Sequence, residues 1–175
     1  MKLTSFEEFV DLAQRGTFVP VCKEIIADLL TPVSAFLKIA EHSDYAFLLE
    51  SVEGGEQVGR YSFLGKDPFL ILRARDGKTI TDRAGETTAS DEPFVATLRR
   101  MMAEFQSPFV PGLPRFTGGA VGYLGYDAAP WFEPVSLQAR ESEPAADQAG
   151  FMLFDTVLAF DHVQHRILKI GRAHV

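Results

Sequence analysis

The chain is poor in cysteine and in basic charge. Cys22 is its only cysteine, so no disulfide can form within the chain, and a reducing, cytoplasmic setting fits that best. The 17 Lys and Arg are outnumbered by 24 Asp and Glu, which gives a formal net charge of −7. A surface that neutralises nucleic-acid phosphates needs a clustered excess of Lys and Arg, so this balance argues against a nucleic-acid partner.

Long apolar runs are also missing. The longest, such as residues 151–154, are far shorter than the roughly 20 residues that a membrane-spanning helix needs. The first residues carry one Lys and then two Glu, with no apolar run behind them. We therefore expect neither a secretory signal nor a membrane partner.

Several motifs that mark chemistry are absent. The sequence has no GxxxxGK[ST] phosphate-binding loop and no HExxH zinc motif. His162 and His165 are the closest pair of histidines, but a spacing of three in a strand–turn region does not bring both to one face, so we expect no metal site. The glycines of Gly118–Asp127 follow the order GGxxGxxG rather than GxGxxG, which does not favour a dinucleotide site. We expect glycine there because the backbone passes close to other strands or needs a positive φ.

The composition is that of a globular protein. Hydrophobic residues make up 46% of the chain and charged residues 23%. A chain of 175 residues can form one domain with a substantial core, since a domain of this size buries roughly 70% of the surface that its unfolded chain exposes. We expect one domain over residues 1–170.

Three helices are indicated. Thr4 or Ser5 can begin a capping box with the glutamates that follow. Thr31-Pro32 is an N-cap followed by proline at the first helical position, and it predicts a helix to about residue 40. Apolar residues at helical spacing predict a third helix over about 91–106.

Segments with β propensity dominate the middle and the end of the chain. Asp76-Gly77 is a strong hairpin turn, and the stretch 45–82 around it predicts an antiparallel meander. Pro20 places its short strand at the edge or the end of a sheet. The fold class that we expect is α+β, with largely antiparallel sheets and inserted helices. The expected strands are 17–21, 45–52, 60–64, 68–75, 78–82, 151–160 and 166–170.

One apolar strand ends in polar residues. Leu48-Leu49 is followed by Glu50 and Ser51, and Ser62 lies on the next expected strand. A carboxylate can receive an ammonium group, and a hydroxyl can donate to a carboxylate, so this set could hold a small zwitterion. The competing interpretation is a strand that simply turns polar at the surface, and composition alone favours it.

Five motifs occur in a fixed order along the chain. They are Thr31–Phe36, Leu48–Ser51 with Ser62, Arg60–Gly65, Gly118–Asp127, and Phe154-Asp155 with Phe160–His162. In this order they resemble the N-terminal region of anthranilate synthase component I, and the resemblance covers about residues 5 to 170.

The resemblance implies the N-terminal part of that family's fold, truncated before the C-terminal chorismate-binding domain. The complete enzyme would convert chorismate and ammonia into anthranilate and pyruvate, the first step of tryptophan biosynthesis. It would use Mg²⁺, and a partner glutamine amidotransferase subunit would supply the ammonia. The family's catalytic and metal-binding residues belong to the missing domain, so no residue here is expected to be catalytic, and the chain alone is expected to be inactive.

The resemblance also implies a regulatory role. Leu49, Glu50, Ser51 and Ser62 match the family's signature for L-tryptophan, the allosteric feedback inhibitor. They would form part of its pocket, and the missing domain would supply the rest.

Two other assignments stay open at this point. One is the N-terminal region of the sister enzyme aminodeoxychorismate synthase component I, and the other is an amino-acid-binding module without catalysis. The last six residues, Ile170–Val175, are also a possible translation of sequencing-adapter DNA. We therefore expect an incomplete regulatory domain over 1–170 and a non-native tail at 170–175.

Overall fold

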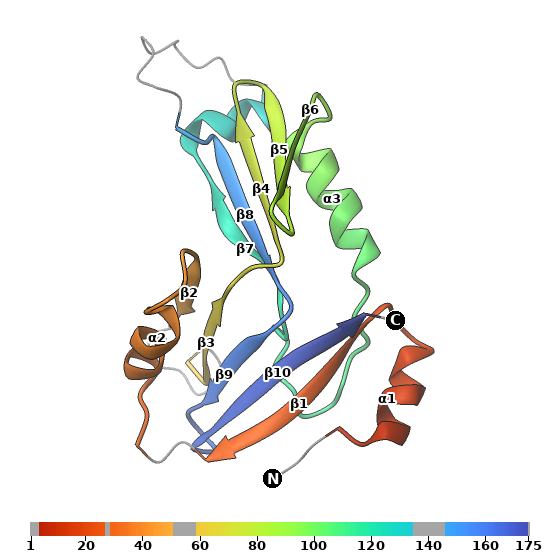
Figure 1. Ribbon diagram of the computed structural model, residues 1–175, viewed down its shortest axis with the longest axis vertical. Helices are drawn as coiled ribbons and strands as arrows, with labels where there is room; N and C mark the ends of the chain where they lie inside the picture. The colour runs from red at the N-terminus through yellow and green to blue at the C-terminus, as the bar shows by residue number, and fades with distance from the viewer. Residues whose placement is uncertain (1–3, 27–28, 51–58, 135–145, 175) are drawn as a thin grey trace. The chain divides into compact units, whose positions relative to one another are not determined.

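Two compact units make up the fold. The structure is a computed structural model that describes residues 4–26, 29–50, 59–134 and 146–174 (Figure 1). The range 1–170, predicted as one regulatory domain, holds parts of both units. Unit 1 comprises Met1–Pro68, Glu104–Gly119 and Phe154–Val175, and unit 2 comprises Phe69–Ala103 and Ala120–Leu153.

Unit 1 is built on a five-stranded antiparallel sheet in the order β1-β10-β9-β3-β2. Pro20 lies in β1, which is an edge strand among those described, as its missing N–H predicts. The strands are β1 (Phe18–Ile26), β2 (Ala46–Leu49), β3 (Tyr61–Lys66), β9 (Val157–Asp161) and β10 (Arg166–His174).

Two helices accompany this sheet. Helix α1 (Phe6–Ala13) begins with the predicted capping box, in which the Ser5 hydroxyl accepts from the Glu8 N–H and the Glu8 carboxylate accepts from the Ser5 N–H. Helix α2 (Pro32–Ala40) begins at the predicted N-cap, Thr31. It lies against β2 and β3 (Figure 1). The core below α2 consists of Ala35, Leu64, Phe160 and Ile167.

The residues predicted to be a non-native tail continue strand β10. They pair with β1 as far as His174 opposite Phe18. Arg172 donates hydrogen bonds to Thr117 and to the Gly118 carbonyl, and its guanidinium lies 4.7 Å from the centre of the Phe18 ring. Burial lowers the pKa of Arg172 to about 10. The non-native origin of these residues stays a prediction, which resequencing of the locus tests.

Unit 2 is built on a second five-stranded sheet, in the order β6-β5-β4-β8-β7. Helix α3 (Phe94–Glu104) packs on it through Phe94, whose ring lies 6.1 Å from that of Phe151. A short 3₁₀ helix, η1 (Tyr126–Trp131), follows β7. The strands are β4 (Leu70–Arg75), β5 (Lys78–Arg83), β6 (Glu86–Ser90), β7 (Gly119–Leu124) and β8 (Ala149–Phe154).

The predicted fold class is confirmed, but two predicted strand arrangements are wrong. The meander over 45–82 is broken at its centre, because β3 pairs with β2 and β9 whereas β4 pairs with β5 and β8. The stretch 151–160 is likewise two strands, β8 and β9, in different sheets. An apolar pattern marks where a strand lies, but it does not say which strand lies beside it.

The glycine-rich segment has the predicted structural role. A side chain at Gly122 would clash with the carbonyl of Gly150 and with Phe151 on the neighbouring strand. Gly118 and Gly119 both have φ of 130°, a region that favours glycine. Close approach and backbone conformation therefore explain these glycines without a bound nucleotide.

Candidate functional site

Three of the four residues predicted to bind tryptophan are described. Leu49 is the last residue of β2 and lies opposite Phe63 of β3. Glu50 follows it directly and is exposed. Ser62 is the neighbour of Phe63 on β3, so the sheet brings it close to the end of β2. Ser51 lies outside the described residues.

Ser62 is enclosed by the protein. Only 1% of the residue is exposed, and it lies opposite Phe160 of β9. Its Oγ is 2.8 Å from Nε2 of His162. A serine beside a histidine is the arrangement of an activated nucleophile, but a hydroxyl this deeply buried cannot reach a substrate. The hydrogen bond therefore fixes His162 to β3.

An ion pair with a buried carboxylate lies beside this hydrogen bond. Arg60 contacts both carboxylate oxygens of Asp161, with Nε–Oδ1 3.0 Å and Nη2–Oδ2 2.8 Å. The Asp161 side chain is fully buried, and it also accepts from the Gln164 N–H at 3.2 Å. Nε of Arg166 lies 3.7 Å from Oδ2. Bidentate geometry of this kind fixes the two strands to each other.

The network controls the protonation of its own groups. Burial raises the pKa of Asp161, but the hydrogen bonds from Arg60 and the Gln164 N–H and the charges of Arg60 and Arg166 together outweigh burial, so this pKa lies below its usual value. Burial is the main cause that raises the pKa of Tyr61, and the nearby Asp161 charge adds to it. Asp161 is therefore a charged carboxylate that the surrounding cations hold in place.

A hollow of about 350 Å³ opens next to the network, at the start of α2. His162, His165 and Arg166 can each donate a hydrogen bond to a carboxylate there. The carboxylate of Asp161 lies among them. The hollow is lined by Leu30, Thr31, Pro32, Phe160, Asp161, His162, His165 and Arg166.

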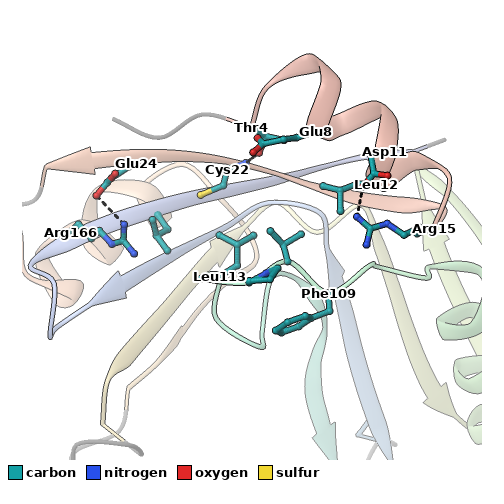
Figure 2. Close-up of a pocket in the computed structure, with 14 residues that line it drawn as sticks. Thr4, Glu8, Asp11, Leu12, Arg15, Cys22, Glu24, Phe109, Leu113 and Arg166 are labelled. Atoms are coloured by element: carbon teal, nitrogen blue, oxygen red, sulfur yellow. Dashed lines mark hydrogen bonds and ion pairs between the residues drawn. The ribbon is translucent and has the colours of Figure 1, made fainter.

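A second cavity, of about 320 Å³, lies between α1, β1, β10 and the connector 109–113 (Figure 2). Its lining includes the buried side chains of Leu12, Cys22 and Leu168. Near it, Arg166 pairs with Glu24 at 3.1 Å, while Arg15 pairs with Asp11. An apolar body with charged groups around it can hold a small amphipathic molecule.

Among the described residues, no group of three or more His, Cys, Asp or Glu side chains could hold a metal ion. None of the helices in the described part of the chain combines the length and the hydropathy that a membrane span requires.

The sequence did not reveal the Arg60–Asp161 pair or the Ser62–His162 hydrogen bond. Each joins residues about a hundred positions apart. Both depend on the register that sets Tyr61 opposite Asp161. Arg60 and His162 both lie in motifs that carry the family resemblance, Arg60–Gly65 and Phe160–His162. Nothing in the sequence indicated that these two motifs are in contact.

The chain is similar to curated proteins over nearly its whole length. It is 38% identical to "Anthranilate synthase component 1" of Acetivibrio thermocellus over 172 residues, which cover 98% of this chain and 34% of that protein. It is 42% identical to the protein of the same name from Synechocystis sp. over 170 residues, 96% of this chain and 33% of that protein. No protein-family model matches the chain.

A solved structure has the same fold. The crystal structure of anthranilate synthase component I from Streptococcus pneumoniae matches with a TM-score of 0.54 and 25% sequence identity. The match covers 86% of this chain and 31% of that one. The chain therefore spans about a third of the length of the proteins that it matches.

Proposed function

Since the chain belongs to the anthranilate synthase component I family, whose N-terminal third it matches, we propose that it is the regulatory part of such an enzyme. The complete protein converts chorismate and ammonia into anthranilate and pyruvate. A second component, a glutamine amidotransferase, supplies the ammonia. The observation that supports this proposal is sequence identity. The chain is 38% to 42% identical to relatives of that name over almost its whole length.

The chemistry itself belongs to the part of the protein that this chain lacks. We propose that the Mg²⁺ of the complete enzyme binds in that part of the protein. The buried Ser62 cannot act as a nucleophile. We propose that the 175-residue chain alone is inactive, because it matches only about a third of the length of its relatives.

The regulatory role centres on the end of β2. Glu50 is exposed and can receive the ammonium group of L-tryptophan, and Leu49 offers an exposed apolar side chain beside it. Ser51 provides a hydroxyl for the ligand's carboxylate. Ser62 acts indirectly, because its hydroxyl is already bonded to His162.

Feedback inhibition requires two states of the complete protein. Tryptophan inhibits only if it binds one state better than the other, and chorismate then opposes tryptophan by the same factor. A coupling free energy of about 1–3 kcal/mol corresponds to roughly 5–150-fold in affinity. Half of a pocket binds poorly, so the chain alone should show weak or no binding of L-tryptophan in calorimetry; tight binding would favour a stand-alone binding module.

The first experiment identifies the reaction. The complete protein and its amidotransferase are incubated with chorismate, glutamine and Mg²⁺, and the products are separated. We expect anthranilate. Aminodeoxychorismate as the product would refute the proposed function.

The second experiment tests the regulatory site. Glu50→Ala and Ser51→Ala in the complete protein should weaken inhibition by tryptophan at least about fivefold, the lower end of a typical coupling, and leave uninhibited turnover unchanged. Asp44→Ala is the control, because Asp44 is an exposed carboxylate just before β2. Normal inhibition of both variants would show that the site lies elsewhere.

A further inference from the structure

The two edges of the unit 2 sheet differ in chemistry. Among the described strands, β6 forms one edge and β7 the other. β6 reads Glu-Thr-Thr-Ala-Ser and is exposed along its whole length. β7 reads Gly-Ala-Val-Gly-Tyr-Leu, with no charged side chain and no proline. Only β6 carries the polar side chains that usually protect an edge from another strand.

Exposed apolar side chains also follow β7, next to the exposed Asp127 and Glu133. Consecutive strand residues point to opposite faces, so the exposure of both Tyr123 and Leu124 leaves both faces of this end open among the described residues. We call β7 with the exposed apolar residues that follow it the β7 edge. The exposed fractions are 52% for Tyr123, 47% for Leu124, 82% for Tyr126 and 56% for Phe132.

The β7 edge is held firmly in unit 2. The Trp131 ring of η1 lies 5.8 Å from the ring of Phe94, which is buried. The Tyr123 hydroxyl donates to the carbonyl of Asp147 at 3.3 Å. Gly122 lets β7 approach β8 more closely than any side chain would allow. An apolar edge fixed in this way is preorganised to receive a partner strand.

The lengths of the relatives favour one occupant, a segment of the same polypeptide. This chain matches about a third of each, so about two thirds of such a polypeptide lies outside it. A strand in that remainder is tethered to the β7 edge through its own backbone, and tethering gives an effective concentration in the millimolar range. A second copy of the chain has no such advantage.

We propose that the β7 edge receives a β-strand from the rest of the longer polypeptide. The added strand would pair with the open side of the β7 backbone, and its side chains would cover Tyr123 and Leu124. The proposal rests on the proposed function, because it needs a polypeptide that continues beyond this chain.

Hydrogen exchange tests the proposal. Amide exchange is measured by mass spectrometry for the 175-residue chain and for the complete protein. Peptides covering 119–126 should exchange about tenfold or more slowly in the complete protein, whereas peptides covering 86–90 in β6 should not change. Equal exchange at β7 in both proteins overturns the proposal. Protection that rises with the concentration of the short chain alone also overturns it, because the occupant is then a second copy.

Matched variants provide a second readout. Leu124→Lys should increase exchange at β7 in the complete protein and have little effect on the short chain, in which this side chain is already half exposed. Thr88→Lys on β6 is the control, and it should change neither protein. Loss of folding of the short chain on Leu124→Lys would show that the residue serves unit 2 itself.

The two proposals fail in distinguishable ways. A complete protein that makes anthranilate but exchanges at β7 as the short chain does refutes the docking surface alone. A complete protein that makes no anthranilate but protects β7 refutes the proposed function alone. A reading frame that does not continue beyond this chain refutes both.

Discussion

Units 1 and 2 use their charged residues differently. In unit 1, Asp161 is fully buried between two arginines, and Ser62 and His162 bond beside it. In unit 2 no side chain of a described ion pair is as buried as Asp161: 26% and 20% of Arg73 and Asp82 are exposed, and 53% and 37% of Arg100 and Glu92. Both units join segments distant in sequence through ion pairs, such as Arg75 with Asp147 in unit 2, but only unit 1 does so through a fully buried carboxylate among the described pairs.

This contrast predicts that removing a charged side chain destabilises unit 1 more than unit 2. Removing one partner of a buried pair leaves the other charge uncompensated, which is costly, whereas exposed pairs contribute little. Trp131, the only tryptophan of the chain, packs in unit 2, so its fluorescence follows that unit. The two units can therefore be monitored separately during unfolding.

The largest effect is expected from Asp161→Asn. The change removes the carboxylate that Arg60 and Arg166 share; because Arg60 is 35% exposed and Arg166 keeps Glu24, the free energy of unfolding of unit 1 should fall by about 2 kcal/mol. Urea unfolding followed by far-UV circular dichroism and by Trp131 fluorescence measures this. An equal shift of both signals would mean that the two units unfold as one.

Lowering the pH should gradually remove the stability that the Asp161 carboxylate contributes to unit 1. The folded pKa of Asp161 lies below its unfolded value of about 3.9, so its contribution is complete above that pH and is lost as pH falls through the folded pKa. The gap in stability between the natural protein and Asp161→Asn should therefore narrow below about pH 4. A gap that stays constant down to pH 2 would contradict this.

Ser62→Ala should have a smaller effect, about 1 kcal/mol. It removes one hydrogen bond, and the exposed His162 can bond to water instead. The unfolding midpoint of unit 1 should fall slightly, while the Trp131 signal is unchanged. A loss as large as that of Asp161→Asn would place Ser62 within the ion-pair network.

The smallest effect is expected in unit 2. Glu92→Gln breaks the exposed pair with Arg100, and the unfolding midpoint followed by Trp131 fluorescence should stay the same within error. Glu92 has its pKa lowered chiefly by the hydrogen bond from Arg100, yet both groups are well solvated. A clear destabilisation would erase the contrast between the units.

Local sequence signals predicted the local structure. The Ser5–Glu8 capping box, the Thr31 N-cap and the Asp76-Gly77 turn each depend on a few neighbouring residues, and all three are present. The glycines of 118–127 were also understood correctly, because their order excluded one motif and left close packing.

Long-range structure could not be predicted from these signals. The segments after Lys66 and after Phe154 each pass from one sheet to the other, and the apolar pattern is the same on both sides of each passage. Arg60 and Asp161 meet only because β3 pairs with β9. The residues of the tryptophan site stay a prediction, because the exposure of Glu50 and the burial of Ser62 do not test ligand binding.

The division of the chain also sets the order in which the units can fold during synthesis. Both segments of unit 2 are synthesised before β9 and β10 of unit 1, and they therefore leave the ribosome first. The β1 residues must wait for partners about 150 positions later, from Phe18 to His174. A nascent chain can therefore complete unit 2 first, while the β1 strand remains without its partner until β10 has been synthesised.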